Sequence, residues 1–254
     1  MNEPASFSYF DMQAFMGTTK HMGGSQSTME MIRLLGIEAS DLVLDVGCGA
    51  GATAVHLAGE IGCRVMAVDL RESMLVLTRQ RAQKEGLLER IEMHQANATQ
   101  LPFEDETFDA VVCESVLTFV EDKQKAIGEF ARLVKQDGAV GLNEQFWIQP
   151  PTDEMRAYTH KVWEFNDLPS RVGWTGFMEQ AGLHDIQSRG YQMDARREAS
   201  QVERYGLSEL WRMFSRTARL YLKNAQFRIY MKDRMKMPKG LFDHLGYGIF
   251  AGKK

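Results

Sequence analysis

A glycine-rich loop directly after an apolar run limits what this chain can fold into more than any other feature. The apolar run is Leu42–Val46, and the loop overlaps its end as Asp45-Val46-Gly47-Cys48-Gly49-Ala50-Gly51. A short apolar run that ends in glycines is typical of a buried strand in a parallel sheet. The glycines permit a tight turn and let a ligand approach the backbone, where amides at the start of the next helix point toward it. The segment therefore predicts an α/β domain that binds a ligand at this turn.

Strands and helices are predicted to alternate after this loop. Further strands are expected at residues 64–69, 91–95, 110–113, 139–142, 185–191 and 247–252. Helices are expected at about 53–60 and at 72–85, 123–133, 152–165 and 173–181. Strands separated by helices form βαβ units and therefore a parallel sheet. The predicted fold class is α/β, a Rossmann-like and mostly parallel seven-stranded sheet with helices on both faces.

An acidic residue stands where the ribose of a nucleotide would need one. Asp69 ends the second predicted strand, 24 positions after Asp45. A carboxylate at that place accepts hydrogen bonds from ribose hydroxyls in dinucleotide-binding folds. The spacing Gly47-x-Gly49-x-x-Ala52 also fits a dinucleotide fingerprint. The loop and the acid alone therefore leave NAD open beside other nucleoside cofactors.

Several segments together resemble the class I S-adenosylmethionine-dependent methyltransferases, in particular the branch that acts on small molecules. The matching segments are residues 43–51, 68–69, 96–103, 108–111 and 246–250. The resemblance is close from Met31 to Leu142 and looser elsewhere. It implies S-adenosylmethionine as the cofactor and methyl transfer to a small-molecule acceptor, which is an amine, a hydroxyl or an activated carbon.

The resemblance also implies which residues hold the cofactor. Asp69 would bind the ribose, Leu70 would pack on the adenine face unless it belongs to the core, and Asn97 and Ala98 would line the adenine. Relatives usually carry Asp at the position of Asn97; here an amide oxygen can still accept from the adenine amino group, and the side-chain NH₂ adds a donor. The methionine end would be surrounded by residues of the glycine-rich loop, namely Asp45, Gly47, Cys48, Gly49 and Gly51.

Two carboxylates are candidates for the chemistry of transfer. Ligands of open α/β sheets bind beyond the carboxyl ends of the strands, where Glu114 follows the fourth strand and Glu144 the fifth. Methyl transfer is an in-line displacement that depends on positioning, and an amine or hydroxyl acceptor can require a general base. We expect Glu114 either to act as that base or to contact the cofactor, and Glu144 either to act as a base or to form a salt bridge at the rim.

The N-terminal segment His21-Met22-Gly23-Gly24 resembles the part of phosphoethanolamine-type N-methyltransferases that folds over the cofactor. The aromatic run Phe7-Ser8-Tyr9-Phe10 could close such a lid, and His21 and Tyr9 are further candidates for the base. The resemblance to the phosphoethanolamine-type enzymes does not extend to the residues that bind and act on their substrate. Thr118 stands where those enzymes are expected to have a catalytic histidine, and Gln145 where they have a phosphate-binding tyrosine. The cofactor site and the lid are therefore carried over, and the substrate is not.

The predicted elements divide the chain into four parts. Residues 1–35 form an N-terminal helical lid, residues 36–150 the S-adenosylmethionine-binding core, residues 151–245 cap helices with the sixth strand, and residues 246–254 the terminal strand of the core sheet. The lid and the cap are expected to enclose the acceptor above the carboxyl ends of the strands.

Cysteine usage and hydropathy predict a cytoplasmic protein. Cys48, Cys63 and Cys113 lie far apart without the spacing of metal ligands, so we expect reduced thiols and no metal site. The N-terminus has no signal-peptide pattern. No apolar run approaches the ~20 residues that span a bilayer.

The C-terminal quarter is basic, although the chain as a whole carries a net charge of −4. Residues 189–254 hold 15 Lys and Arg against six Asp and Glu. Such a segment can meet nucleic acid, a membrane surface or an anionic substrate. The alternatives are therefore a nucleic-acid-binding or membrane-surface module, methylation of a lipid headgroup, and a non-catalytic S-adenosylmethionine-binding protein.

An amphipathic stripe lies within this basic segment. It consists of Leu207, Leu210, Trp211, Phe214, Ala218, Tyr221 and Leu222, with Arg212, Arg216, Arg219 and Lys223 on other faces. Aromatic side chains that share the apolar face, instead of alternating with the charges, are unlike a nucleic-acid surface. We expect the stripe to be buried against the α/β domain as one wall of the acceptor pocket. The expected partner is then a small-molecule acceptor, with no nucleic acid and no stable membrane insertion, and the oligomeric state stays open.

Overall fold

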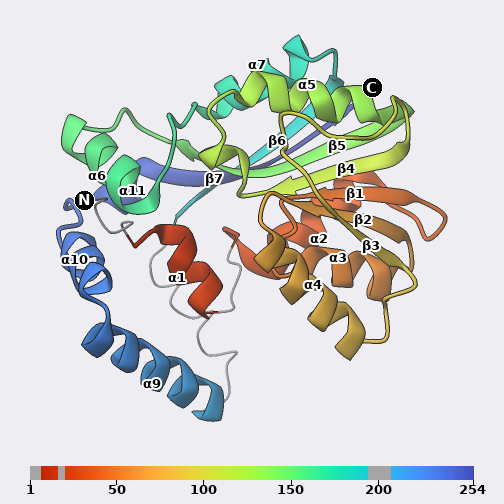
Figure 1. The fold of residues 1–254 in the computed structure, drawn as a ribbon. Coiled ribbons are helices and arrows are strands. Elements are labelled where there is room, and N and C mark those ends of the chain that lie inside the picture. Colours follow the sequence, from red (N-terminus) through yellow and green to blue (C-terminus); the bar gives the residue numbers. More distant parts are fainter. Residues whose placement is uncertain (1–6, 17–20, 194–206) are drawn as a thin grey trace.

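The computed structural model describes residues 7–16, 21–193 and 207–254. Its centre is a seven-stranded sheet in the order β3-β2-β1-β4-β5-β7-β6 (Figure 1). The strands are β1 (Leu42–Val46), β2 (Arg64–Asp69), β3 (Ile91–Gln95), β4 (Phe108–Glu114), β5 (Val134–Trp147), β6 (His184–Gln192) and β7 (Leu245–Lys253). The strands from β3 to β5 are parallel, and β7 runs antiparallel to both β5 and β6. The predicted α/β fold with a mostly parallel seven-stranded sheet is confirmed.

Helices cover both faces of the sheet and create two apolar layers (Figure 1). The helices on one face are α2 (Gly24–Leu35), α3 (Ala52–His56) and α4 (Glu72–Lys84), and those on the other are α5 (Lys123–Leu133) and α7 (Arg171–Gln180). Met31 and Leu75 are buried in the first layer, Phe130 and Trp174 in the second. Because the central strands are covered on both sides, β1 reads as an almost continuous apolar run.

A third apolar cluster forms the cap beyond the ends of β5 and β7. The helices around it are α1 (Tyr9–Met16), α6 (Asp153–Trp163), α10 (Ala225–Arg234) and α11 (Leu241–His244). Phe227 is fully buried in this cluster, and the ring of Phe7 meets it edge-on at a centroid distance of 5.0 Å. The sequence pattern predicted α6 and α7 but not α10 and α11, whose few apolar residues lie among many charges.

The largest boundary error concerns β5. The sequence predicted a strand at 139–142, because Asn143, Glu144 and Gln145 interrupt the apolar run. All three side chains are nevertheless buried, and the strand continues to Trp147. The helix expected at 53–60 is divided into α3 and a single π-helical turn, η1 (Leu57–Ile61), and a short 3-10 turn, η2 (Leu117–Phe119), follows β4.

The amphipathic stripe is not buried as predicted. It lies on α9 (Leu207–Lys223), where Trp211, Phe214 and Leu222 are 68%, 65% and 78% exposed. No described residue of α9 lines the pocket: Tyr9 and Phe10 of α1 line it instead, and α9 packs against α10. The side chains of Leu207, Leu210 and Arg212 are not among those that the structure describes. Within the described ranges, no helix has both the length and the apolar character needed to cross a membrane.

Candidate active site

A cavity of about 340 Å³ opens at the carboxyl ends of β1, β2 and β4. This is where ligands bind in open α/β sheets. The predicted site residues that line it are Tyr9, His21, Asp45, Gly47, Cys48, Gly49, Asp69, Leu70, Asn97, Ala98 and Glu114. Gly51 and Glu144 are outside the lining. The structure therefore brings most of the predicted site together from six separate segments of the chain.

The glycine-rich loop is held against β2 in a conformation that requires glycine. The amides of Gly47 and Cys48 donate to the carbonyl of Val68 at 2.8 and 2.9 Å. Gly47 has φ +73°, and a Cβ there would lie 2.2 Å from Cγ2 of Val116. Gly51 has φ +74°, and a Cβ there would lie 2.7 Å from Cγ2 of Thr78. Gly47 thus keeps the floor of the cavity open, whereas Gly51 allows the start of α3 to pack closely on α4.

Asp69 occupies the position that the sequence predicted for a ribose-binding acid. Its Oδ2 accepts from the amide of Gly49 at 3.0 Å, and its Oδ1 accepts from the amide of Arg71 at 2.9 Å. The side chain is almost buried, yet it lines the cavity. Each carboxylate oxygen can accept a second hydrogen bond. The two backbone amides therefore fix the carboxylate and leave acceptor capacity toward the cavity.

Leu70, Asn97 and Ala98, which the resemblance assigns to the adenine, line the same cavity. Leu70 is 62% exposed, so it is not a core residue and its side chain is available to a ligand. The oxygen of Asn97 accepts from both the amide and the hydroxyl of Thr99 at 3.0 Å. Of the two roles predicted for this amide, acceptor and donor, the contacts with Thr99 occupy the oxygen and favour the role of the side-chain NH₂ as a donor to a ligand.

Asp45 is buried beneath the loop with one oxygen unsatisfied. Among the described residues, its Oδ2 has no hydrogen-bond partner. Burial raises the pKa of this carboxyl well above its usual range, and the nearby charges of Glu114 and Asp69 raise it further. A buried, unpaired acceptor on the wall of a cavity is the arrangement expected where a cationic or hydrogen-bond-donating ligand completes the site.

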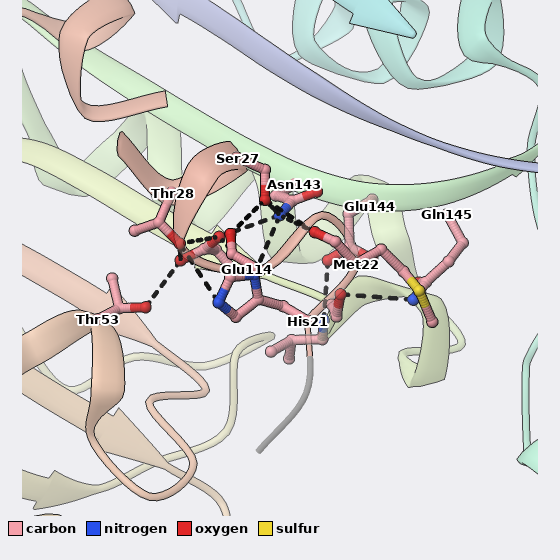
Figure 2. Close-up of polar contacts among 12 residues, drawn as sticks. His21, Met22, Ser27, Thr28, Thr53, Glu114, Asn143, Glu144 and Gln145 are labelled. Carbon is pink, nitrogen blue, oxygen red and sulfur yellow. Dashed lines mark hydrogen bonds and ion pairs between the residues drawn. The ribbon is translucent and has the colours of Figure 1, made fainter. Parts of the chain in front are cut away.

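Glu114 is the centre of a polar cluster that joins the N-terminal segment to the core (Figure 2). Its carboxylate accepts from Oγ1 of Thr53 at 2.8 Å, from Oγ1 of Thr28 at 3.0 Å and from Nδ2 of Asn143 at 3.0 Å. Nδ1 of His21 lies 3.2 Å from the same carboxylate. These partners come from α2, α3, β5 and the segment before α2. Sequence reasoning missed Thr28, Thr53 and Asn143, which carry no motif.

Both ring nitrogens of His21 face this cluster. Nδ1 lies 3.2 Å from Glu114, and Nε2 lies 3.3 Å from Oγ1 of Thr28. A base must reach the proton that it removes, and His21 would have to leave both contacts to do so. The geometry therefore favours a positioning role for His21 over the role of general base that the sequence suggested.

Glu144 holds the loop after β4 and does not face the cavity. Its Oε1 accepts from the amides of Val116 and Leu117 at 2.9 and 2.8 Å, and its Oε2 accepts from the amide and hydroxyl of Thr118 at 3.1 and 2.8 Å. The side chain is fully buried. The geometry corrects both sequence interpretations, a catalytic base and a salt bridge at the rim, because four donors inside the protein occupy the carboxylate.

The comparison with known proteins agrees with this site. Residues 44–142 match a family model described as a methyltransferase domain. An uncharacterized protein of Haemophilus influenzae is 33% identical over 177 residues, which cover 68% of this chain and 70% of that protein. This chain belongs to the S-adenosylmethionine-dependent methyltransferases. The predicted resemblance and enzyme class are thereby confirmed.

Two further similarities are to methyltransferases whose names state a substrate or a pathway. The ubiquinone/menaquinone biosynthesis C-methyltransferase of Klebsiella pneumoniae is 35% identical over 141 residues, 54% of each chain. The structure of phosphoethanolamine N-methyltransferase 2 of Haemonchus contortus with S-adenosylmethionine has the same fold, with a TM-score of 0.73, 20% identity and coverage of 96% of this chain and 56% of that one. The alignments thus span about half of these two proteins.

The cofactor of the methyltransferase is S-adenosylmethionine, which removes the NAD alternative. The described residues fit this group. The unsatisfied Oδ2 of Asp45 can accept a hydrogen bond from the ammonium group of S-adenosylmethionine. Gly47 leaves space for the cofactor against the backbone of the loop, because a Cβ at this position would fill that space. When bound, the cofactor supplies an electrophilic methyl group on a sulfonium.

The buried carboxyl of Glu144 predicts a pH dependence of the free energy of unfolding. Burial raises its pKa from the ordinary 4.5 to about 7, although the hydrogen bonds that it accepts lower it. Between these two values the folded state keeps a proton that the unfolded state has released. The contribution of Glu144 to the free energy of unfolding is therefore fully present below about pH 4.5. This contribution, ~3 kcal/mol, is lost as the pH rises to about 7.

Urea denaturation of the wild type and of Glu144→Gln, on both sides of this pH window, measures that contribution. The variant has no titrating group at this position, so its unfolding free energy should depend less steeply on pH. Equal slopes in the two proteins would contradict the predicted contribution of Glu144.

Proposed function

We propose that this methyltransferase methylates an apolar, electron-rich aromatic ring, at a ring carbon or at a hydroxyl oxygen of the ring. The observation that carries the proposal is an aromatic wall in the cavity. Tyr9 and Phe10 of α1 contact the ring of Phe119, at centroid distances of 5.8 Å and 4.6 Å, and all three line the cavity. Flat apolar ligands pack well against such rings.

The charges in the cavity support the same acceptor class. The acids among the lining residues are Asp45, Asp69 and Glu114. We assign the first two to the cofactor, and Glu114 is occupied by four partners of its own. Beside the aromatic wall the neutral polar lining residues are Ser115 and Gln145, and the guanidinium of Arg71, also a lining residue, lies over the Phe10 ring. Among the described lining residues, no further carboxylate faces this part of the cavity. This distribution speaks against a cationic amine as the acceptor. The Klebsiella relative, by its name a C-methyltransferase of quinone biosynthesis, supports a ring carbon.

Cofactor binding is assigned to the predicted loop and strand ends. Asp69 would bind the ribose, Leu70 and Ala98 would pack on the adenine, and Asn97 would donate to it. Gly47, Cys48 and Gly49 would line the methionine end, with Asp45 and Glu114 near its ammonium, and Gly51 would support the loop from behind. In-line transfer then depends on how the acceptor ring is held against the methyl group.

The N-terminal residues 1–35 are proposed as the lid over this site, with residues 36–150 as the core, residues 151–245 as the cap and residues 246–254 as the terminal strand. Two contacts support the lid. The amide of Tyr9 donates to Glu164 of the cap at 2.9 Å, and the guanidinium of Arg71 lies 4.2 Å from the centre of the Phe10 ring. The lid is thereby tied to the cap on one side and to the cofactor-binding core on the other.

Replacing Phe10 with alanine should lower kcat/KM for the acceptor by tenfold to a hundredfold, because an aromatic side chain contributes about 1.5–3 kcal/mol when it is covered by a ligand. The affinity for S-adenosylmethionine should change little. The assay measures S-adenosylhomocysteine by mass spectrometry, with hydroquinones and catechols in one panel and primary amines in another.

Two controls test whether the loss of activity comes from the aromatic wall itself. Phe177→Ala removes a ring on α7 that is not among the cavity-lining residues and should leave kcat/KM unchanged. Tyr9→Phe keeps the ring and removes the hydroxyl, so it should stay active unless Tyr9 is the general base. Turnover of amines but not of hydroxylated rings would refute the proposed acceptor.

A further inference from the structure

The apolar face of α9 is turned outward. Trp211, Phe214 and Leu222 are largely exposed, and the rings of Trp211 and Phe214 stack on each other at a centroid distance of 6.0 Å. Contiguous exposed apolar patches on soluble proteins usually mark interaction sites. The face is therefore a candidate docking surface, which we call the α9 face and define as Trp211, Phe214 and Leu222.

The helix is anchored at its C-terminal end. Leu220 packs against the cap cluster, and Tyr221 meets Phe227 of α10 edge-on. Nη1 of Arg228 donates to the carbonyls of Tyr221 and Leu222 at 3.0 and 3.2 Å. Figure 1 shows α9 and α10 as an arm that extends from the cap away from the sheet. These contacts hold α9 in place while its apolar face stays outward.

The arm is strongly basic. Residues 207–239 contain nine Lys and Arg but two Asp and Glu. One of these acids, Asp233, already pairs with Lys161 and Lys236 at 2.8 and 2.9 Å. Arg216, Arg219 and Lys223 are exposed and recur at intervals of three and four, on a different side of α9 from the apolar face. The rest of the chain is acidic, so positive charge is concentrated where the apolar side chains are exposed.

We propose that α9 docks the methyltransferase reversibly on the surface of an anionic lipid bilayer. The α9 face enters the boundary between headgroups and acyl chains, and Arg216, Arg219 and Lys223 lie at the level of the anionic headgroups. A helix with Trp, Phe and Leu on one face and Lys and Arg on the other has the composition of an interfacial helix. Reversible docking at a bilayer surface is compatible with the expectation of no stable membrane insertion, and it favours the membrane-surface alternative that the sequence leaves open.

Two other occupants fit these observations less well. Nucleic acid would require aromatic side chains interleaved with the charges, but Trp211 and Phe214 share the apolar face. A second copy of this chain would bring two arms of the same sign together, which is unfavourable without compensating acids. An anionic bilayer satisfies both the apolar face and the charge.

The arm is also connected to the pocket. The ring of Phe7 packs on Phe227 and Tyr230 of α10 at centroid distances of 5.0 and 5.6 Å, and Tyr9 and Phe10 of the aromatic wall follow it in the chain. Docking would bring this wall close to a bilayer, where an apolar acceptor dissolves. This last step depends on the proposed function, whereas the docking of α9 does not.

The test is sedimentation of the full chain with vesicles of phosphatidylcholine, with and without phosphatidylglycerol, at ~0.15 M salt. We expect binding to the anionic vesicles and at least tenfold weaker binding to the neutral ones, because each Lys or Arg near an anionic surface contributes ~1 kcal/mol. Fluorescence gives an independent readout. Trp147, Trp163 and Trp174 are buried or half-buried, so a blue shift on binding reports Trp211.

Matched variants decide the outcome. Phe214→Ser/Leu222→Ser and Arg216→Glu/Arg219→Glu should each weaken binding at least tenfold. The controls Val172→Ser on α7 and Arg79→Glu/Lys84→Glu on α4 change equally exposed apolar and basic residues and should bind as the wild type does. Trp211→Phe should sediment normally but lose the blue shift.

Three results would overturn the docking proposal. These are no binding to anionic vesicles, equal binding by the α9 variants and the controls, or self-association through the α9 face in the absence of lipid. Because none of these measurements involves methyl transfer, an error in the proposed acceptor would leave their interpretation intact.

Discussion

Replacing Asp69 with alanine is expected to weaken S-adenosylmethionine binding by tenfold to more than a hundredfold. The variant loses the proposed acceptor of the ribose hydroxyls, and hydrogen bonds to a charged group are worth about 1.5–3 kcal/mol. It also releases the amides of Gly49 and Arg71, which the carboxylate holds in place. Isothermal titration calorimetry measures the change directly.

The Asp69 experiment needs two controls. Asp69→Asn keeps one acceptor oxygen and should lose less affinity than the alanine variant. Glu92→Ala removes an exposed acid from β3 and should bind the cofactor normally. Unchanged affinity in Asp69→Ala, or tight NAD binding by the wild type, would contradict the assigned role of Asp69.

Replacing Glu114 with leucine is expected to lower the free energy of unfolding by about 3–5 kcal/mol, the cost of removing one partner from a buried ionic cluster. The substitution leaves Thr28, Thr53 and Asn143 without their common acceptor, and each orphaned donor is costly. His21 loses its carboxylate neighbour at the same time. Urea denaturation gives the loss, and binding of S-adenosylmethionine should fall with it.

Glu114→Gln is the matched variant. It retains one acceptor oxygen of similar shape, so its loss of stability should be clearly smaller than that of Glu114→Leu. A loss below about 1 kcal/mol in the leucine variant would show that water or a rearranged His21 replaces the carboxylate, and that the cluster does not stabilise the fold as described.

The elements that the sequence predicted well are those with a strong local pattern. Apolar runs located β1 and β2, and the closely spaced glycines indicated the loop around Gly47. In the structure these glycines have positive φ. Because parallel strands end at one edge of the sheet, the same patterns brought Asp69 and Glu114 to one cavity. Most of the residues that line this cavity were therefore predictable before any contact was known.

The parts that were missed depend on contacts between distant segments. Thr28, Thr53 and Asn143 are ordinary polar residues until the fold gathers them around Glu114. Glu144 comes shortly after the strand that was predicted at 139–142, where a catalytic carboxylate is expected, and no local pattern indicates that three backbone amides bury it inside a longer strand. The apolar stripe of α9 predicted burial because amphipathic helices usually face a core, but here α1 already occupies the pocket wall.

The central strand β5 has a consequence for how this enzyme can diverge. Asn143 on this strand binds the cluster at the donor end, and the adjacent Glu144 binds the loop that carries the acceptor wall. Neighbouring residues of one strand are ~3.3 Å apart and move together. In the proposed site, the alignment of donor and acceptor is thus set by an interior strand, and substitutions of the lid residues that line the cavity would change the surface facing the acceptor without disturbing that alignment.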